Sequence, residues 1–75
     1  MYQLDHLDDL AKAIRAGARG AIDATRPLST GEALYVALAS NCASLLKERG
    51  YTITQALARI GPDWTAELTR RWQHA

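Results

Sequence analysis

Apolar residues in the middle of the chain recur with the period of an α-helix. The segment 33–46 reads ALYVALASNCASLL and is the most apolar stretch of the sequence. At about 100° per residue, Leu34, Leu38 and Leu45 fall within a narrow arc. This pattern predicts the central, core-forming helix of a small helical domain.

Capping signals mark both ends of this helix. Ser29 and Glu32 have the spacing of a capping box, in which each side chain accepts a hydrogen bond from the other residue's backbone N–H. Gly50 follows two basic residues and can adopt the left-handed conformation that ends many helices. The signals together predict one helix over about 30–49.

The N-terminal part of the chain is predicted to form a helix over about 5–24, with Leu7 and Ile14 on its inner side. Small residues recur at spacings of three and four along another flank. They are Ala13, Ala16, Gly17, Gly20 and Ala24. Each interior glycine costs about 1 kcal/mol relative to alanine. Close packing against a helix of a second copy or of another protein could offset this cost, and a break between the glycines is the alternative.

Two shorter helices are predicted at the C-terminal end. Thr52 and Gln55 repeat the capping-box pattern and begin a helix over about 53–60. A Gly-Pro pair at 61–62 stops it, and a last helix covers about 63–73. The two short helices are expected to form a helical hairpin against the first two.

Four helices without a strand signal predict an all-α fold, a compact bundle in which residues 1–75 form a single domain. Only 16 side chains are Leu, Ile, Val or Met, whereas 14 are Ala, so the core is thin. A net charge of +1 still favours an ordered chain. The thin core favours association with a partner or a second copy.

Charge and composition disfavour several functional classes. Nine basic residues face eight acidic ones, which argues against strong nonspecific binding of nucleic acid. The longest apolar run, 33–39, is far too short to span a membrane. The acidic N-terminus lacks the pattern of a signal peptide and there is one cysteine, so a cytoplasmic location is expected.

The sequence contains few candidates for chemistry. Cys42 lies on the apolar arc of the central helix and is predicted to be a protonated core residue. His6 and His74 lie at opposite ends of the chain, and no set of residues has metal-ligand spacing. Asp8 and Asp9 are adjacent on a helix and point in different directions. The chain is therefore expected to be non-enzymatic, without a cofactor or metal.

The outer side of the first predicted helix carries charges of both signs and is interpreted as a solvated face. Its charged residues are Asp5, Asp8, Lys12, Arg15, Arg19, Asp23 and Arg26.

The leading functional hypothesis is a self-associating protein-interaction module. Its interface would use the small residues of the first helix, together with Arg71 and Trp72, because Trp and Arg are enriched at interface hot spots. Trp64 and Trp72 lie two turns apart on one helical face and are expected to contribute mainly to the core.

The alternative is a small DNA-binding regulator that uses residues 52–72 as a degenerate helix-turn-helix. Its backbone contacts would come from Arg59, Arg70 and Arg71. The N-terminal end of the second helix, which enters the groove in such proteins, carries acidic residues that phosphates repel.

Overall fold

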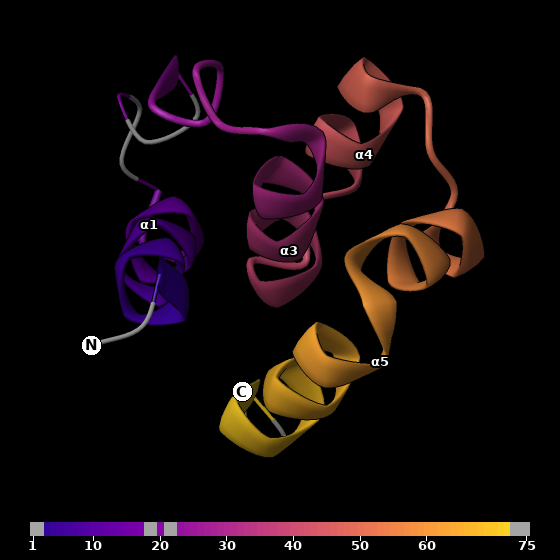
Figure 1. Ribbon diagram of the computed structural model, residues 1–75. Coiled ribbons are helices and arrows are strands. Elements are labelled where there is room, and N and C mark those ends of the chain that lie inside the picture. The colour runs from indigo at the N-terminus through magenta and orange to yellow at the C-terminus, as the bar shows by residue number, and fades with distance from the viewer. Residues whose placement is uncertain (1–2, 18–19, 21–22, 73–75) are drawn as a thin grey trace.

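A computed structural model describes residues 3–17, 20 and 23–72, and within these residues the regular structure is helical (Figure 1). Its helices are α1 (Gln3–Arg15), α3 (Thr30–Ala39), α4 (Ala43–Arg49) and α5 (Ile53–Trp72). The prediction of an all-α bundle is confirmed, but several predicted boundaries differ. None of the described helices has the length and apolar character needed to cross a membrane.

Helix α3 lies at the centre of the molecule, in contact with α1, α4 and α5 (Figure 1). It is buried on nearly every side, as expected for the most apolar segment of the chain. One side packs against Leu4, Leu7 and Ala11 of α1. Another packs through Leu34 against α4 and the first half of α5. The predicted central helix therefore joins two hydrophobic clusters.

The prediction of one helix over 30–49 is wrong, because α3 ends at Ala39. Asn41 adopts a left-handed conformation with φ 57°, and its N–H donates to the carbonyl of Leu38. The N–H of Cys42 donates to the carbonyl of Ala37, which completes a Schellman motif. Cys42 therefore precedes α4 in an extended conformation and is half-buried, not placed in the middle of a helix.

The prediction of a helix over 5–24 is also wrong, because α1 ends at Arg15. Gly17 has φ 85°, a conformation that suits glycine and ends the helix. Further along the chain, the N–H of Ala24 donates to the carbonyl of Gly20. The alternative of a break near the glycines is thus the one that the structure adopts.

The predicted helix caps are present. The N–H of Ser29 donates to Glu32 Oε1 at 2.9 Å, and the N–H of Glu32 donates to Ser29 Oγ at 3.3 Å. Thr52 and Gln55 form the same reciprocal pair at 3.0 and 3.1 Å. Gly50 ends α4 in the left-handed conformation with φ 75°.

Helix α5 is kinked at Gly61, which has φ 89° and ψ 168°. Gly61 and Pro62 lie between the segments predicted at 53–60 and 63–73, so the two predicted helices are present as the two halves of α5, on either side of the non-helical Gly61; position 73 lies outside the described residues. The Thr65 hydroxyl donates to the carbonyl of Gly61 at 2.7 Å. The kink directs the two halves of α5 to different clusters: Ala56 packs with α4, whereas the second half packs against α1.

Candidate functional site

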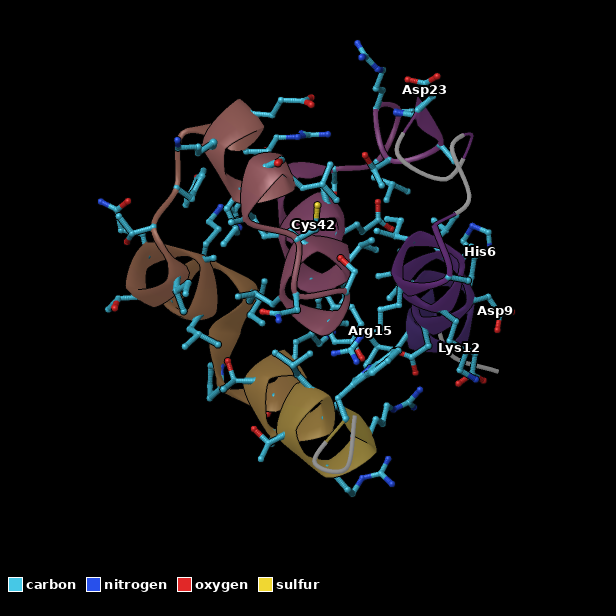
Figure 2. The ribbon with its side chains drawn as sticks, turned by 180° about the vertical axis from the view of Figure 1, so that it is seen from behind. His6, Asp9, Lys12, Arg15, Asp23 and Cys42 are labelled. Atoms are coloured by element: carbon cyan, nitrogen blue, oxygen red, sulfur yellow. The ribbon has the colours of Figure 1, made fainter. Side chains whose placement is uncertain are left out.

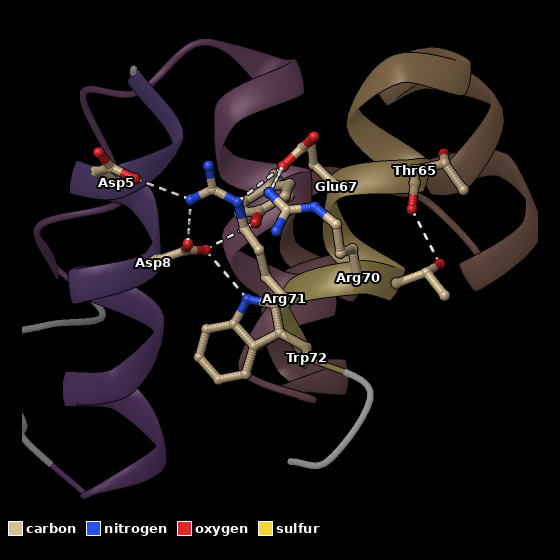
Figure 3. Close-up of polar contacts among 9 residues, drawn as sticks. Asp5, Asp8, Thr65, Glu67, Arg70, Arg71 and Trp72 are labelled. Atoms are coloured by element: carbon tan, nitrogen blue, oxygen red, sulfur yellow. Dashed lines mark hydrogen bonds and ion pairs between the residues drawn. The ribbon is translucent and has the colours of Figure 1, made fainter. Parts of the chain in front are cut away.

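The carboxylate of Asp8 is the centre of a polar network that joins three helices (Figure 3). Its Oδ1 accepts hydrogen bonds from the Tyr35 hydroxyl at 2.7 Å and from Trp72 Nε1 at 3.0 Å. Its Oδ2 accepts a hydrogen bond from Arg71 Nη1 at 2.7 Å. Asp8 belongs to α1, Tyr35 to α3, and the other two donors to α5, so one side chain connects the outer helices to the central one.

Arg71 extends this network along the surface. Its Nη1 also reaches Asp5 Oδ1 at 2.9 Å, and its Nε donates to Glu67 Oε1 at 3.0 Å. Arg70 binds the same oxygen of Glu67. The side chain of Arg71 is only 19% exposed. The guanidinium is therefore held in one position by three carboxylates.

The network fixes the protonation states of its members. Burial by itself would raise the pKa of Asp8, but hydrogen bonds from Tyr35, Arg71 and Trp72 outweigh it and lower that pKa below its usual value. Burial and the neighbouring carboxylate raise the pKa of Tyr35 well above its ordinary value. At neutral pH, Asp8 is therefore ionised and Tyr35 keeps its proton.

Sequence reasoning missed Asp8, which was assigned to a solvated face but is only 9% exposed. A signal for its burial was present in the helical pattern. Asp8 lies four residues after Leu4, next to Leu7, and three residues before Ala11, and all three are buried. A carboxylate at the edge of an apolar stripe points inward and needs donors there.

Aromatic side chains surround the network. Trp64 packs edge-on against Tyr35 with ring centroids 5.7 Å apart. The guanidinium of Arg15 lies 4.8 Å from the centre of the Trp72 ring, and its Nε donates to the carbonyl of Ala39 at 2.8 Å. Both tryptophans are half-buried against the cluster formed with α1. Their predicted contribution to the core is thus present, and both remain partly accessible.

A cleft of about 520 Å³ opens beside the network. Its lining residues are Leu4, Asp63, Trp64, Ala66, Glu67, Arg70 and Arg71. The lining combines apolar side chains with charges of both signs. Such a surface suits another protein better than a small apolar ligand.

The small-residue interface predicted on the first helix is not a continuous face. Ala13 is half-buried on α1, whereas Ala16 and Gly17 lie in the turn after it. Gly20 and Ala24 lie beyond this turn and are joined by a backbone hydrogen bond, and Ala16, Gly17, Gly20 and Ala24 are all exposed. The break at Gly17 therefore prevents these residues from forming one helical stripe.

The three arginines proposed to contact DNA lie on different halves of α5. Arg59 is exposed on the first half of α5. Arg70 and Arg71 lie on the second half, and both are paired with carboxylates. Arg71 is only 19% exposed and three carboxylates already bind it, so a phosphate would have to displace them, and the arrangement gives the DNA-binding alternative less support than the sequence does.

Cys42 borders two further hollows, whose lining residues are not members of the Asp8 network. One, of about 470 Å³, is also lined by Arg15 and Asn41. Figure 2 labels Arg15 and Cys42. The other, of about 60 Å³, lies next to Ile53, which is 62% exposed. No group of three or more metal-ligating side chains converges within residues 3–17, 20 and 23–72.

Comparisons with known proteins do not assign this chain: no protein family, no curated protein and no solved structure shows significant similarity to it.

Proposed function

We propose that this chain is a small, non-enzymatic protein-interaction module that self-associates through the cleft beside the Asp8 network. One observation carries the proposal. The cleft combines an accessible tryptophan, Trp64, with the arginines Arg70 and Arg71 and with the apolar Leu4. Trp and Arg are the residue types most enriched among hot spots of protein interfaces.

The rigidity of this surface supports the same function. Arg71 is held by Asp5, Asp8 and Glu67, and Tyr35 contacts Trp64 from the interior. Side chains that are already ordered lose little conformational entropy when a partner binds. The proposed contact surface therefore differs from the one predicted from the sequence. It uses the second half of α5 in place of the small residues of the first helix, and Trp64 in place of Trp72.

A thin hydrophobic core is a second reason to propose self-association. The described core residues include many alanines, and burying the half-buried Trp64 against a second copy would add apolar area. The single cysteine of the chain is the basis for proposing that the module acts in the cytoplasm.

Sedimentation velocity over a series of micromolar concentrations tests the proposal. The wild type is expected to form dimers whose population rises with concentration. Ala66→Glu, in the cleft, should shift the protein to monomer, whereas Ala58→Glu, on the exposed side of the first half of α5, should behave like the wild type. A wild type that remains monomeric at all concentrations would contradict self-association.

A further inference from the structure

The exposed face of the second half of α5 has a charge pattern that is complementary to itself. Asp63 lies at its N-terminal end, Ala66 near its middle, and Arg70 at its C-terminal end, and all three are exposed. Their spacings of three and four residues place them on one side of the helix. They also line the same cleft, together with Glu67. We call these four residues the α5 face.

This pattern distinguishes between two ways of pairing two copies. In a two-fold symmetric dimer, if one residue contacts a second, the second contacts the first across the axis. An antiparallel arrangement centred between Ala66 and Glu67 places Asp63 of each copy opposite Arg70 of the other. A parallel arrangement would place Asp63 opposite Asp63 and Arg70 opposite Arg70, which repel each other.

We infer that two copies of this chain pair through antiparallel α5 faces, with two symmetry-related Asp63–Arg70 contacts. This inference rests on the self-association proposed above and specifies its geometry. Ala66 lies opposite Glu67 in this arrangement. A methyl side chain at the crossing point lets the two helices approach closely, at the short end of the usual interaxial range.

The central carboxylate does not oppose this pairing. Glu67 would face its counterpart across the axis at short range, but its Oε1 accepts from both Arg70 and Arg71 within the same copy. Arg71 keeps this contact in the proposed dimer, whereas Arg70 is shared between Glu67 of its own copy and Asp63 of the other. Trp64 lines the cleft next to the α5 face, is half-buried, and provides apolar contact for the helix of the second copy.

A charge-swap experiment tests the pairing, with the dissociation constant measured by sedimentation equilibrium of the full chain. Asp63→Arg and Arg70→Asp each place like charges opposite one another twice per dimer. Each single variant should weaken the dimer by about tenfold or more. The double variant Asp63→Arg/Arg70→Asp restores opposite charges at both contacts, and its dissociation constant should return to within about threefold of the wild-type value.

The helix dipole makes this rescue informative. An arginine at position 63 and an aspartate at position 70 both oppose the dipole of the second half of α5, so the double variant has two unfavourable placements within each copy. The folded monomer of the double variant is therefore not more stable than that of the wild type. Recovery of the dimer in the double variant cannot be explained by a more stable monomer. Arg59→Asp, on the exposed first half of α5, changes the charge by the same amount as Arg70→Asp and should leave the dimer unchanged.

The possible results separate the inference from the function on which it depends. A wild type that is monomeric at every concentration would overturn both. A dimeric wild type with unaffected single variants, or a double variant that stays as weak as the single variants, would overturn the antiparallel α5 pairing and leave self-association standing. Weakening in both single variants with recovery in the double variant would support the inference.

Discussion

The hydroxyl of Tyr35 donates a 2.7 Å hydrogen bond to the carboxylate of Asp8, across 27 positions of the sequence. Tyr35 is fully buried, so its hydroxyl has no access to water and needs this partner. The same carboxylate receives Trp72 and Arg71 from the end of α5. A single ionised group thus fixes the relative positions of the first, central and last described helices.

Replacing Tyr35 by Phe should destabilise the protein by about 1–2 kcal/mol, because Asp8 loses a buried donor while Trp72 still binds the same oxygen. Urea denaturation followed by circular dichroism would measure the change. Tyr51→Phe is the matched control, since Tyr51 is half-buried and should be within about 0.5 kcal/mol of wild type. Equal effects of the two substitutions would show that the Asp8 contact contributes little.

Replacing Asp8 by Asn should destabilise the protein more than Tyr35→Phe does, by about 2–4 kcal/mol. The amide group of Asn would turn an N–H toward a donor, and the charge that binds Arg71 would be lost. Asp9 provides a neighbouring control, since it is exposed on the same helix and Asp9→Asn should change stability by less than about 0.5 kcal/mol. Thermal unfolding of the two variants side by side gives the comparison. Similar melting temperatures would argue against a structural role for the Asp8 network.

Acid should weaken the fold through Asp8. Its pKa in the folded protein lies below the ordinary value of 3.8, so the unfolded chain takes up a proton at a higher pH than the folded chain does. The stabilisation is fully present above the ordinary pKa and is lost as the pH falls through the lower, folded-state pKa. Hydrogen bonds from Arg70 and Arg71 lower the pKa of Glu67, which acts in the same direction.

The pH dependence can be assigned by comparison with Asp8→Asn. Unfolding free energies measured from about pH 6 down to about pH 2 should fall more steeply for the wild type than for this variant, because the variant keeps only the other carboxylates. Parallel curves would show that Asp8 has the same pKa in the folded and unfolded chains.

Replacing Gly61 by Ala should destabilise the protein by about 1–3 kcal/mol. Its φ of 89° and ψ of 168° lie in a region that is almost restricted to glycine. The added Cβ would meet no atom within 4 Å, so the cost comes from the backbone conformation alone. Gly31→Ala, inside α3, should instead stabilise by about 0.5–1 kcal/mol. Opposite signs in the two denaturation experiments would confirm that the kink requires glycine.

Local signals in the sequence determined much of the secondary structure. The capping boxes at Ser29 and Thr52 fix where α3 and α5 begin, because the partner side chain lies only three residues away. Gly50 and Gly61 were also predicted to end helices, because a glycine conformation with positive φ is a property of one residue and needs no distant contact. The apolar period of 33–46 likewise identified the central helix.

Other boundaries depended on competition between a local stop and a longer apolar pattern. Asn41 and Gly17 both adopt left-handed conformations that end helices, yet the periodic residues around them favoured longer helices. The sequence does not state which tendency is stronger at such a position. Packing decides it: the break at Asn41 lets α4 turn and place Leu45 and Leu46 against Leu34.

The tertiary structure alone determined the candidate site. Asp8 and Arg71 are 63 positions apart, and nothing local indicates that their side chains meet. Each residue by itself is typical of an exposed helical surface, where a charge is favourable. Only the assembly of α1, α3 and α5 removes Asp8 from water and supplies Tyr35, Arg71 and Trp72 as donors. The sequence thus determined the helices through contacts within one or two turns, and the fold determined the site, because a buried carboxylate is stable only where distant donors converge on it.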